Sequence, residues 1–153
     1  MDDRARRLCW HGMGLFLLGL VTGLAVQQLT NPRMGLAAHL EGVMNGIFLL
    51  ALGAAWPHVR LPRRAAALAF GAALYGAWAN WATTTLAAAL GTAAMTPIAA
   101  GAHRGRPWAE LLVTVGFGSV AVAMLLAAAL LLWGLRRRAG AALTREAVMH
   151  GEP

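Results

Sequence analysis

The stretch AAHLEGVMNGIFLLALG, residues 37–53, combines an apolar run with three polar side chains. Its second half is apolar, as a helix that crosses a lipid bilayer requires. Its first half carries His39, Glu41 and Asn45, which are costly to bury in hydrocarbon. Polar groups at membrane depth usually face a partner helix or a cavity. The stretch therefore predicts a membrane span that carries part of a functional site.

The composition of the chain extends this prediction to the whole fold. Of 153 residues, 59% are hydrophobic and 12% are charged, which is about half the charged fraction of an ordinary soluble domain. The apolar residues form four runs long enough to cross a bilayer, at residues 8–29, 36–56, 65–90 and 109–135. We expect an all-α integral membrane four-helix bundle over residues 1–138, followed by a polar C-terminal tail at residues 139–153.

Arginine placement predicts the orientation of the spans. The chain has a net charge of +7 and no lysine. Ten arginines flank the spans on one side, whereas Arg33, Arg104 and Arg106 lie on the other. The excess of positive charge on cytoplasmic loops then places both termini in the cytoplasm. Because topology accounts for these arginines, we expect no nucleic-acid partner.

The second span presents two different faces. On a helix, His39, Gly42 and Gly46 share one face, while Glu41 and Asn45 share another. The glycine strip predicts that something large and flat can approach His39. A neutral imidazole there suits metal or haem ligation, or acid–base catalysis. The residues alone leave open a third alternative, a histidine hydrogen-bonded between helices or near the headgroups.

The third span carries amide and hydroxyl groups beside aromatic rings. Gly76, Asn80 and Thr84 form one stripe at a spacing of four residues, with Trp78 and Trp81 beside it. This pattern suits a pocket for a small aromatic molecule with one polar group. The alternative is an interfacial aromatic belt with a structural asparagine. The tryptophans lie in the middle of the span, which favours the pocket.

Small residues also recur at a spacing of four, at Gly19 and Gly23 and at Gly42 and Gly46. Such pairs let helices approach closely. They predict either tight packing inside one protomer or an oligomer interface, and the sequence alone does not choose between the two.

Four segments of the chain resemble the hydroxylaminobenzene mutase family. They are WHGMGLFLLGLVTGL, NPRMGLAAHLEGVMNGIFLLALG, YGAWANWATTTLAAALGTAAMTPIA and LLLWGLRRR, which together cover most of residues 10–138. That family consists of small bacterial membrane enzymes of nitroarene degradation. The resemblance implies an isomerase in the bacterial cytoplasmic (inner) membrane that moves the hydroxyl group of an N-aryl hydroxylamine to the ring, giving a 2-aminophenol. It also implies a small aromatic substrate and contact with membrane lipid.

A more distant similarity is to styrene oxide isomerase, a four-helix membrane enzyme that converts an aryl epoxide into an aldehyde. The shared skeleton comprises His11, Gly12, His39, Asn45, Gly46, Trp78 and Asn80. This similarity implies a homotrimer with haem b at the subunit interfaces and His39 as the ligand of the iron. The isomerase has an acidic residue where Tyr75 stands and a tyrosine where Thr84 stands, and these differences fit a different substrate.

Helical spacing and the resemblance together predict two groups of site residues. The expected cofactor-binding residues are His39, Gly42, Gly46 and Trp78. The expected catalytic residues, which orient the substrate, are Asn45, Asn80, Tyr75 and Thr84. The alternatives are aryl epoxide rearrangement of the styrene oxide isomerase type and a non-catalytic b-haem membrane protein. Only His39 lies well inside a span, which favours an open coordination position over the two axial ligands of an electron carrier.

Overall fold

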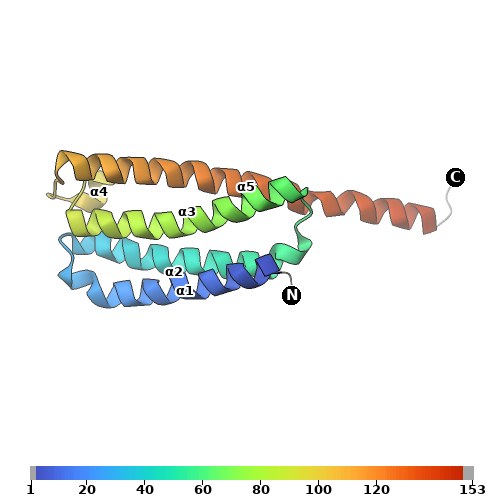
Figure 1. Ribbon diagram of the computed structural model, residues 1–153, viewed down its shortest axis with the longest axis horizontal. Coiled ribbons are helices and arrows are strands. Elements are labelled where there is room, and N and C mark those ends of the chain that lie inside the picture. The colour runs from blue at the N-terminus through green and yellow to red at the C-terminus, as the bar shows by residue number, and fades with distance from the viewer. Residues whose placement is uncertain (1–2, 150–153) are drawn as a thin grey trace.

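The computed structural model describes residues 3–149, and the side chains of residues 3–136. The described part is all-helical and contains no strand. Its elements are α1 (Asp3–Ala25), η1 (Val26–Gln28), α2 (Pro32–Ala55), η2 (Trp56–His58), α3 (Arg63–Leu90), α4 (Pro97–Ala100) and α5 (Pro107–Met149). Four long helices lie side by side, and the short α4 lies near one end of them (Figure 1).

Local sequence signals explain where the helices begin and end. The Asn31 side chain accepts a hydrogen bond from the backbone N–H of Met34 at 3.1 Å, which caps α2, and Pro32 occupies the first helical turn. At the far end of α3, Gly91 adopts a left-handed conformation with φ 61°. Glycine takes this conformation without the steric cost that a side chain would add.

Three helix boundaries differ from the predicted ones. The first helix begins at Asp3 and not near residue 8, and α2 begins at Pro32 and not near residue 36. In both cases the polar residues beside the apolar run are part of the helix. The last helix continues past the arginines to Met149, because alanine and arginine favour helix and no proline stops it. The predicted polar tail is therefore helical over residues 139–149, and residues 150–153 lie outside the described part.

Helices α1 and α2 pack closely through glycine. A Cβ atom added at Gly42 would lie 2.5 Å from the Cα of Gly19, and one at Gly46 would lie 2.6 Å from the backbone nitrogen of Phe16. Only residues without a side chain allow two helix backbones to come this near. Three of the four paired glycines, Gly19, Gly42 and Gly46, thus serve packing inside one protomer.

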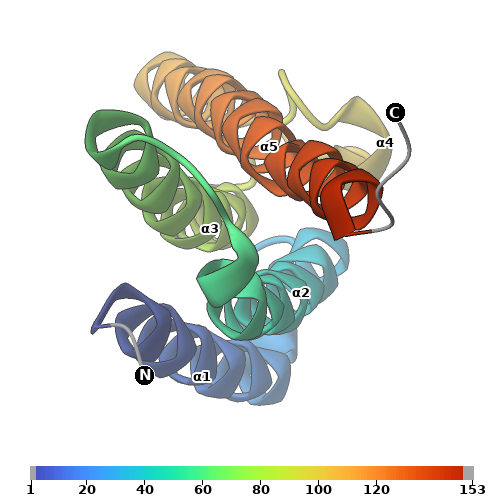
Figure 2. The same cartoon turned by 90° about the vertical axis from the view of Figure 1, so that its right-hand side faces the viewer.

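Helix α3 lies between α2 and α5 and contacts both (Figure 2). Its buried positions are small, including Ala69, Ala73 and Ala77, and they meet larger apolar residues of the neighbouring helices such as Leu49 and Leu131. Small residues facing large ones allow close helix packing. This packing fixes the side of α3 that faces α2, where the polar residues of the site lie.

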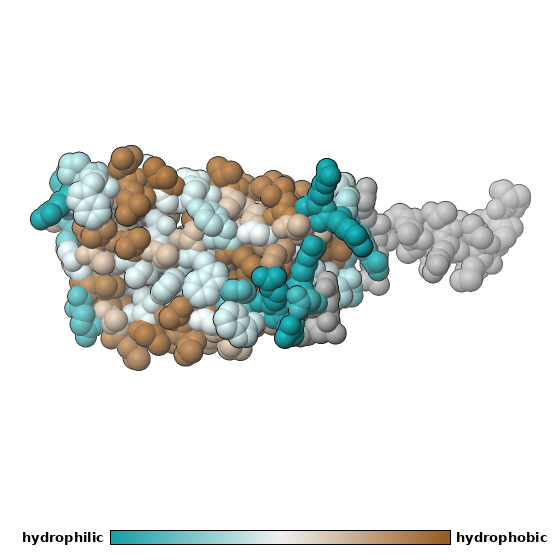
Figure 3. Space-filling view, viewed as in Figure 1, coloured by the Kyte–Doolittle hydropathy of each residue, from teal (hydrophilic) through white to brown (hydrophobic). Residues whose placement is uncertain are grey.

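The outer surface is apolar between two polar ends (Figure 3). Large hydrophobic side chains such as Leu24, Leu125 and Leu132 are exposed on it. Three stretches are long and apolar enough to cross a membrane: Asp3–Gln28, Pro32–His58 and Pro107–Arg136. Helix α3, with 28 residues, is long enough but is not among them. The membrane prediction is thus supported for three of the four predicted spans.

Candidate functional site

His39 lies on α2 and is held by a backbone carbonyl of α1. Its Nδ1 atom is 2.8 Å from the carbonyl oxygen of Gly19. A carbonyl only accepts hydrogen bonds, so Nδ1 carries the proton and donates. In this tautomer the lone pair is on Nε2. This arrangement is typical of metal-ligating histidines, in which one ring nitrogen is fixed by a hydrogen bond and the other is the ligand.

An open apolar groove lies beside His39 between α1 and the start of α2. Its volume is about 550 Å³, and its lining residues are Leu20, Gly23, Leu24, Val26, Gln27, Leu36 and His39. We call it the His39 groove. A Cβ atom at Gly23 would lie 2.7 Å from Nδ1 of His39, so the glycine makes room for the imidazole. A single imidazole in an apolar groove of this size could hold a metal ion or the iron of a haem.

The other expected cofactor-binding residues lie outside the His39 groove. Helix α1 covers Gly42 and Gly46, so a flat group could lie over them only if α1 moved away. Trp78 lies on α3, where its ring is 6.1 Å from that of His11 and 6.1 Å from that of Trp81, centroid to centroid. The sequence predicted a flat group over the face of α2 that carries His39, Gly42 and Gly46. In the structure α1 covers that face at Gly42 and Gly46 and leaves it open beside His39.

A carboxylate joins two of the expected catalytic residues between α2 and α3. The Nδ2 atom of Asn45 donates to Oε2 of Glu41 and to the backbone oxygen of Glu41, both at 2.9 Å. The Nδ2 atom of Asn80 donates to the same Oε2 atom at 2.5 Å. Oε2 of Glu41 therefore accepts hydrogen bonds from both amides, and neither amide donates to Oε1. We call Glu41, Asn45 and Asn80 the carboxylate–amide cluster.

Sequence reasoning left Glu41 out of the expected site. A signal was present, because Glu41 and Asn45 are four residues apart on one helix and their side chains are neighbours there. What the sequence does not show is the register between α2 and α3, which brings Asn80 to the same oxygen.

The remaining expected catalytic residues are less central. The Thr84 hydroxyl donates to the backbone oxygen of Asn80 at 2.8 Å, so it acts within α3. The Tyr75 oxygen is 2.7 Å from Oγ of Ser119 on α5, and Ser119 itself donates to the carbonyl of Gly116. Tyr75 is therefore the donor of that pair. The residue is 52% exposed, and its hydroxyl lies against α5.

Aromatic and polar side chains pack against one another between α1 and α3. The Nε1 atom of Trp81 donates to the hydroxyl of Thr22 at 3.1 Å. The buried Nδ1 atom of His11 and Nε1 atom of Trp78 have no hydrogen-bond partner among the described residues. The predicted aromatic pocket is thus largely occupied by contacts between the helices. Gly76, which the sequence placed in one stripe with Asn80 and Thr84, lies against Met124 of α5 and not between α1 and α3.

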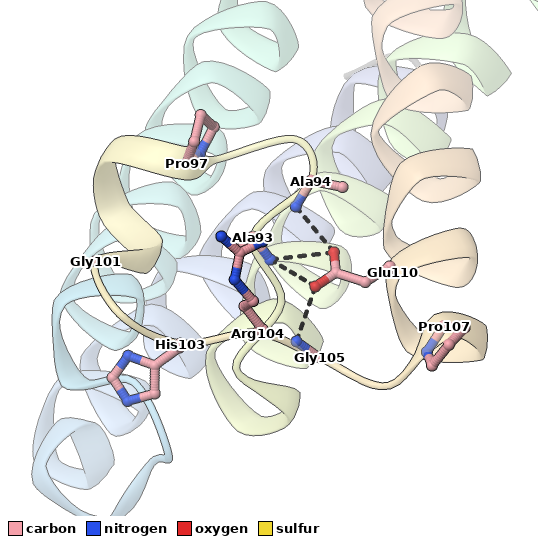
Figure 4. Close-up of a pocket in the computed structure, with 9 residues that line it drawn as sticks. All are labelled: Ala93, Ala94, Pro97, Gly101, His103, Arg104, Gly105, Pro107 and Glu110. Carbon is pink, nitrogen blue, oxygen red and sulfur yellow. Dashed lines mark hydrogen bonds between the residues drawn. The ribbon is translucent and has the colours of Figure 1, made fainter.

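The connection between α3 and α5 is closed by Glu110 (Figure 4). Its carboxylate accepts hydrogen bonds from the backbone N–H groups of Ala93, Ala94 and Gly105 at 2.8 to 3.1 Å. A cavity of about 490 Å³ lies beside these bonds, with His103 and Arg104 on its wall. Because backbone donors occupy both Glu110 oxygens, this carboxylate fixes the loop and is not a free reactive group.

These features define a small all-helical membrane protein with a histidine groove on one side of α2 and a carboxylate–amide cluster on the other. The chain belongs to the styrene oxide isomerase family, whose sequence model matches residues 4–136.

Two mutases are similar over most of the chain. Hydroxylaminobenzene mutase HabB of Ectopseudomonas oleovorans is 51% identical over 133 residues, which are 86% of this chain and 81% of that protein. Hydroxylaminobenzene mutase HabA of the same organism is 46% identical over 127 residues, 82% of this chain and 94% of that protein. No solved structure matches the chain. The resemblance is confirmed, and the chain is an isomerase and not a non-catalytic haem carrier.

Proposed function

We propose that the chain transfers the hydroxyl group of an N-aryl hydroxylamine to the adjacent ring carbon, giving a 2-aminophenol. The observation that carries this proposal is the identity of 51% and 46% with two hydroxylaminobenzene mutases over more than four fifths of the chain. The reaction is an isomerisation, so it needs neither an oxidant nor a reductant.

We also propose that all four long helices cross the bacterial cytoplasmic membrane, with both termini inside. Two observations support this topology. Helix α3 lies between α2 and α5, which are themselves apolar enough to span. The N-terminus and the C-terminal end of α5 lie at the same end of the molecule (Figure 1). That end also carries most of the arginines, as cytoplasmic ends do.

In this proposal His39 would hold the iron of a haem b through Nε2. The fit rests on the hydrogen bond from Nδ1 to Gly19 and on the apolar walls of the His39 groove. When bound, the haem iron would supply a Lewis acid for the reaction. The leucines of the groove would keep bulk water away from the reacting group when the groove lies in lipid.

The carboxylate–amide cluster orients the substrate. Asn45 and Asn80 each donate a hydrogen bond from Nδ2 to Glu41. The Oδ1 atom of each asparagine is therefore left to accept a hydrogen bond from the substrate. The N–H and O–H groups of an aryl hydroxylamine are donors that match these acceptors. Thr84 supports Asn80 through the backbone, and Tyr75 presents a hydroxyl on the side of α5.

An oligomer completes the site. His39 and Glu41 are two residues apart, so they point about 200° apart around α2. His39 faces α1, and Glu41 faces α3. One copy of the chain therefore presents the two groups on different sides, and a second copy must bring its cluster to the His39 groove. We propose a homotrimer, the assembly that the resemblance implies.

A second candidate, favoured by the family match, is rearrangement of an aryl epoxide to an aldehyde. Purified protein should be given hydroxylaminobenzene and, separately, styrene oxide, both without reductant. The proposal expects 2-aminophenol from the first substrate at the higher kcat/KM. Faster turnover of the epoxide would replace it with the second candidate, and a requirement for electrons would exclude both.

The cofactor is tested by an optical spectrum of the purified protein. We expect a Soret band in the wild type and its loss in His39→Ala. His103→Ala is the matched control, because His103 also bonds a backbone carbonyl through Nδ1 but lies in the loop. A wild-type protein that folds, converts substrate and has no Soret band after growth with haem would refute the cofactor. A band that persists in His39→Ala would refute the ligand.

A further inference from the structure

We propose that a pocket at the start of α1 binds the phosphate headgroup of an anionic phospholipid. The pocket has a volume of about 190 Å³ and is lined by Arg6, Arg7, Trp10 and His11. A phosphate group takes the space of a few water molecules, each about 30 Å³, so the pocket has room for it. The inference concerns lipid and does not depend on the proposed activity.

Two guanidinium groups supply the charge that an anion requires. Arg7 lies against α3, with its guanidinium carbon 5.4 Å from the centre of the Phe70 ring. Arg6 pairs with Asp3 at 2.9 Å through Nη2, but both side chains are exposed, so this ion pair contributes little. Each guanidinium carries five N–H donors, which leaves several to bind phosphate oxygens.

The pocket lies where α1 enters the membrane. The stretch Asp3–Gln28 is long and apolar enough to span, and Arg6 and Arg7 lie near its first end. Hydrophilic residues gather at the end of the molecule where α1 begins, beside the apolar band (Figure 3). Trp10 is exposed there, as tryptophan often is at the level of the headgroups. Basic pockets in this position bind anionic lipid headgroups in membrane proteins.

An apolar stripe on α1 favours lipid over free phosphate as the source of the phosphate group. Trp10, Met13 and Leu17 are spaced by three and four residues, so they share one face of the helix, and all three are exposed. From Trp10 to Leu17 the helix rises by about 10 Å, which is less than the roughly 15 Å of hydrocarbon in one leaflet. The acyl chain of a lipid whose headgroup lies in the pocket can therefore follow this stripe, whereas a free phosphate leaves it unused.

Lipid titration of the purified full-length protein, followed by native mass spectrometry, tests the site. The wild type should bind phosphatidylglycerol more tightly than phosphatidylcholine with the same acyl chains, and millimolar inorganic phosphate should not displace the lipid. An arginine beside an anionic headgroup contributes about fivefold in affinity, so Arg6→Gln combined with Arg7→Gln should weaken phosphatidylglycerol binding about 25-fold. Asp3→Asn should strengthen it about two- to fivefold, because a repelling carboxylate is removed and Arg6 is released.

Arg63→Gln combined with Arg64→Gln is the matched control. These two arginines begin α3 at the same end of the molecule, they are exposed, and they do not line the pocket. The control removes the same amount of charge as the Arg6 and Arg7 variant. It should change the affinity little, because salt screens charges that do not touch the ligand.

Four results would overturn the inference. Equal losses in the two double variants would assign lipid binding to the general positive charge of this end. Equal affinity of the wild type for the two lipids would remove the preference for an anion, and displacement by inorganic phosphate would assign the pocket to the free anion. If the Arg6 and Arg7 variant loses its helicity, Asp3→Asn decides, and unchanged or weaker binding by Asp3→Asn would refute the site.

Discussion

Replacing Gly42 by alanine tests whether α1 and α2 pack as closely as the structure indicates. The added Cβ would lie 2.5 Å from the Cα of Gly19 and 2.9 Å from its backbone nitrogen. These are backbone atoms, so no side-chain rotation relieves the contact. Restoring an ordinary carbon–carbon separation of 3.5–4.0 Å requires the two helices to move apart by about 1 Å.

The expected cost follows from two opposing terms. Overpacking of a close-packed interior costs about 1–3 kcal/mol, and the rigid partner places Gly42→Ala in the upper half of that range. Alanine is a better helix former than glycine by up to about 1 kcal/mol. We therefore expect a net loss of about 1–2 kcal/mol in the free energy of unfolding. The measurement is denaturant titration of the purified protein in detergent, followed by helicity.

Gly71→Ala is the matched control. Gly71 also lies on a long helix, but an added Cβ meets nothing within 4 Å there, so this variant should be unchanged or slightly more stable. Gly19→Ala should behave like Gly42→Ala. The double variant should lose less than the two single losses together, because one methyl group already separates the helices. Equal stability of Gly42→Ala and Gly71→Ala would refute the close crossing.

Two further predictions concern the loop between α3 and α5. Glu110→Gln should speed amide hydrogen exchange at Ala93, Ala94 and Gly105, because glutamine has one acceptor oxygen for these three N–H donors. Unchanged exchange at these residues would contradict the role of Glu110 in fixing the loop. Gly91→Ala should lower the free energy of unfolding by about 1–2 kcal/mol, the cost of a left-handed conformation for a residue with a Cβ. The same titration measures it, and a neutral result would argue against the positive φ.

Much of the helical fold could be predicted from the sequence, because hydrophobic runs and their breaks are local signals. The predicted gaps between the spans, at residues 30–35, 57–64 and 91–108, fall where the structure ends one long helix and begins the next. The boundaries that were missed have local causes as well. Pro32 opens a helix, since its missing N–H has no partner to lose in the first turn. Residues 136–149 contain good helix formers and no proline, so the helix continues.

The site was predictable only in part, because it depends on how the helices face one another. Helical spacing correctly separated His39 from Glu41 and Asn45. It could not show that α1 lies on Gly42 and Gly46, since glycine spacing indicates a close approach without naming the partner. Nor could it show that Asn80 meets Glu41, because that contact depends on the register of α3 against α2.

The two faces of α2 make different parts of the proposed mechanism separable. The α1 side holds His39 through Gly19, whereas the α3 side holds the carboxylate–amide cluster. A change that moves α1, such as Gly42→Ala, acts first on the hydrogen bond that fixes the imidazole. A change at Glu41 leaves that bond in place and removes the oxygen that both amides share. The first kind of variant should therefore alter the haem spectrum, and the second should raise KM for the hydroxylamine, because neither face of the helix contains the other's contacts.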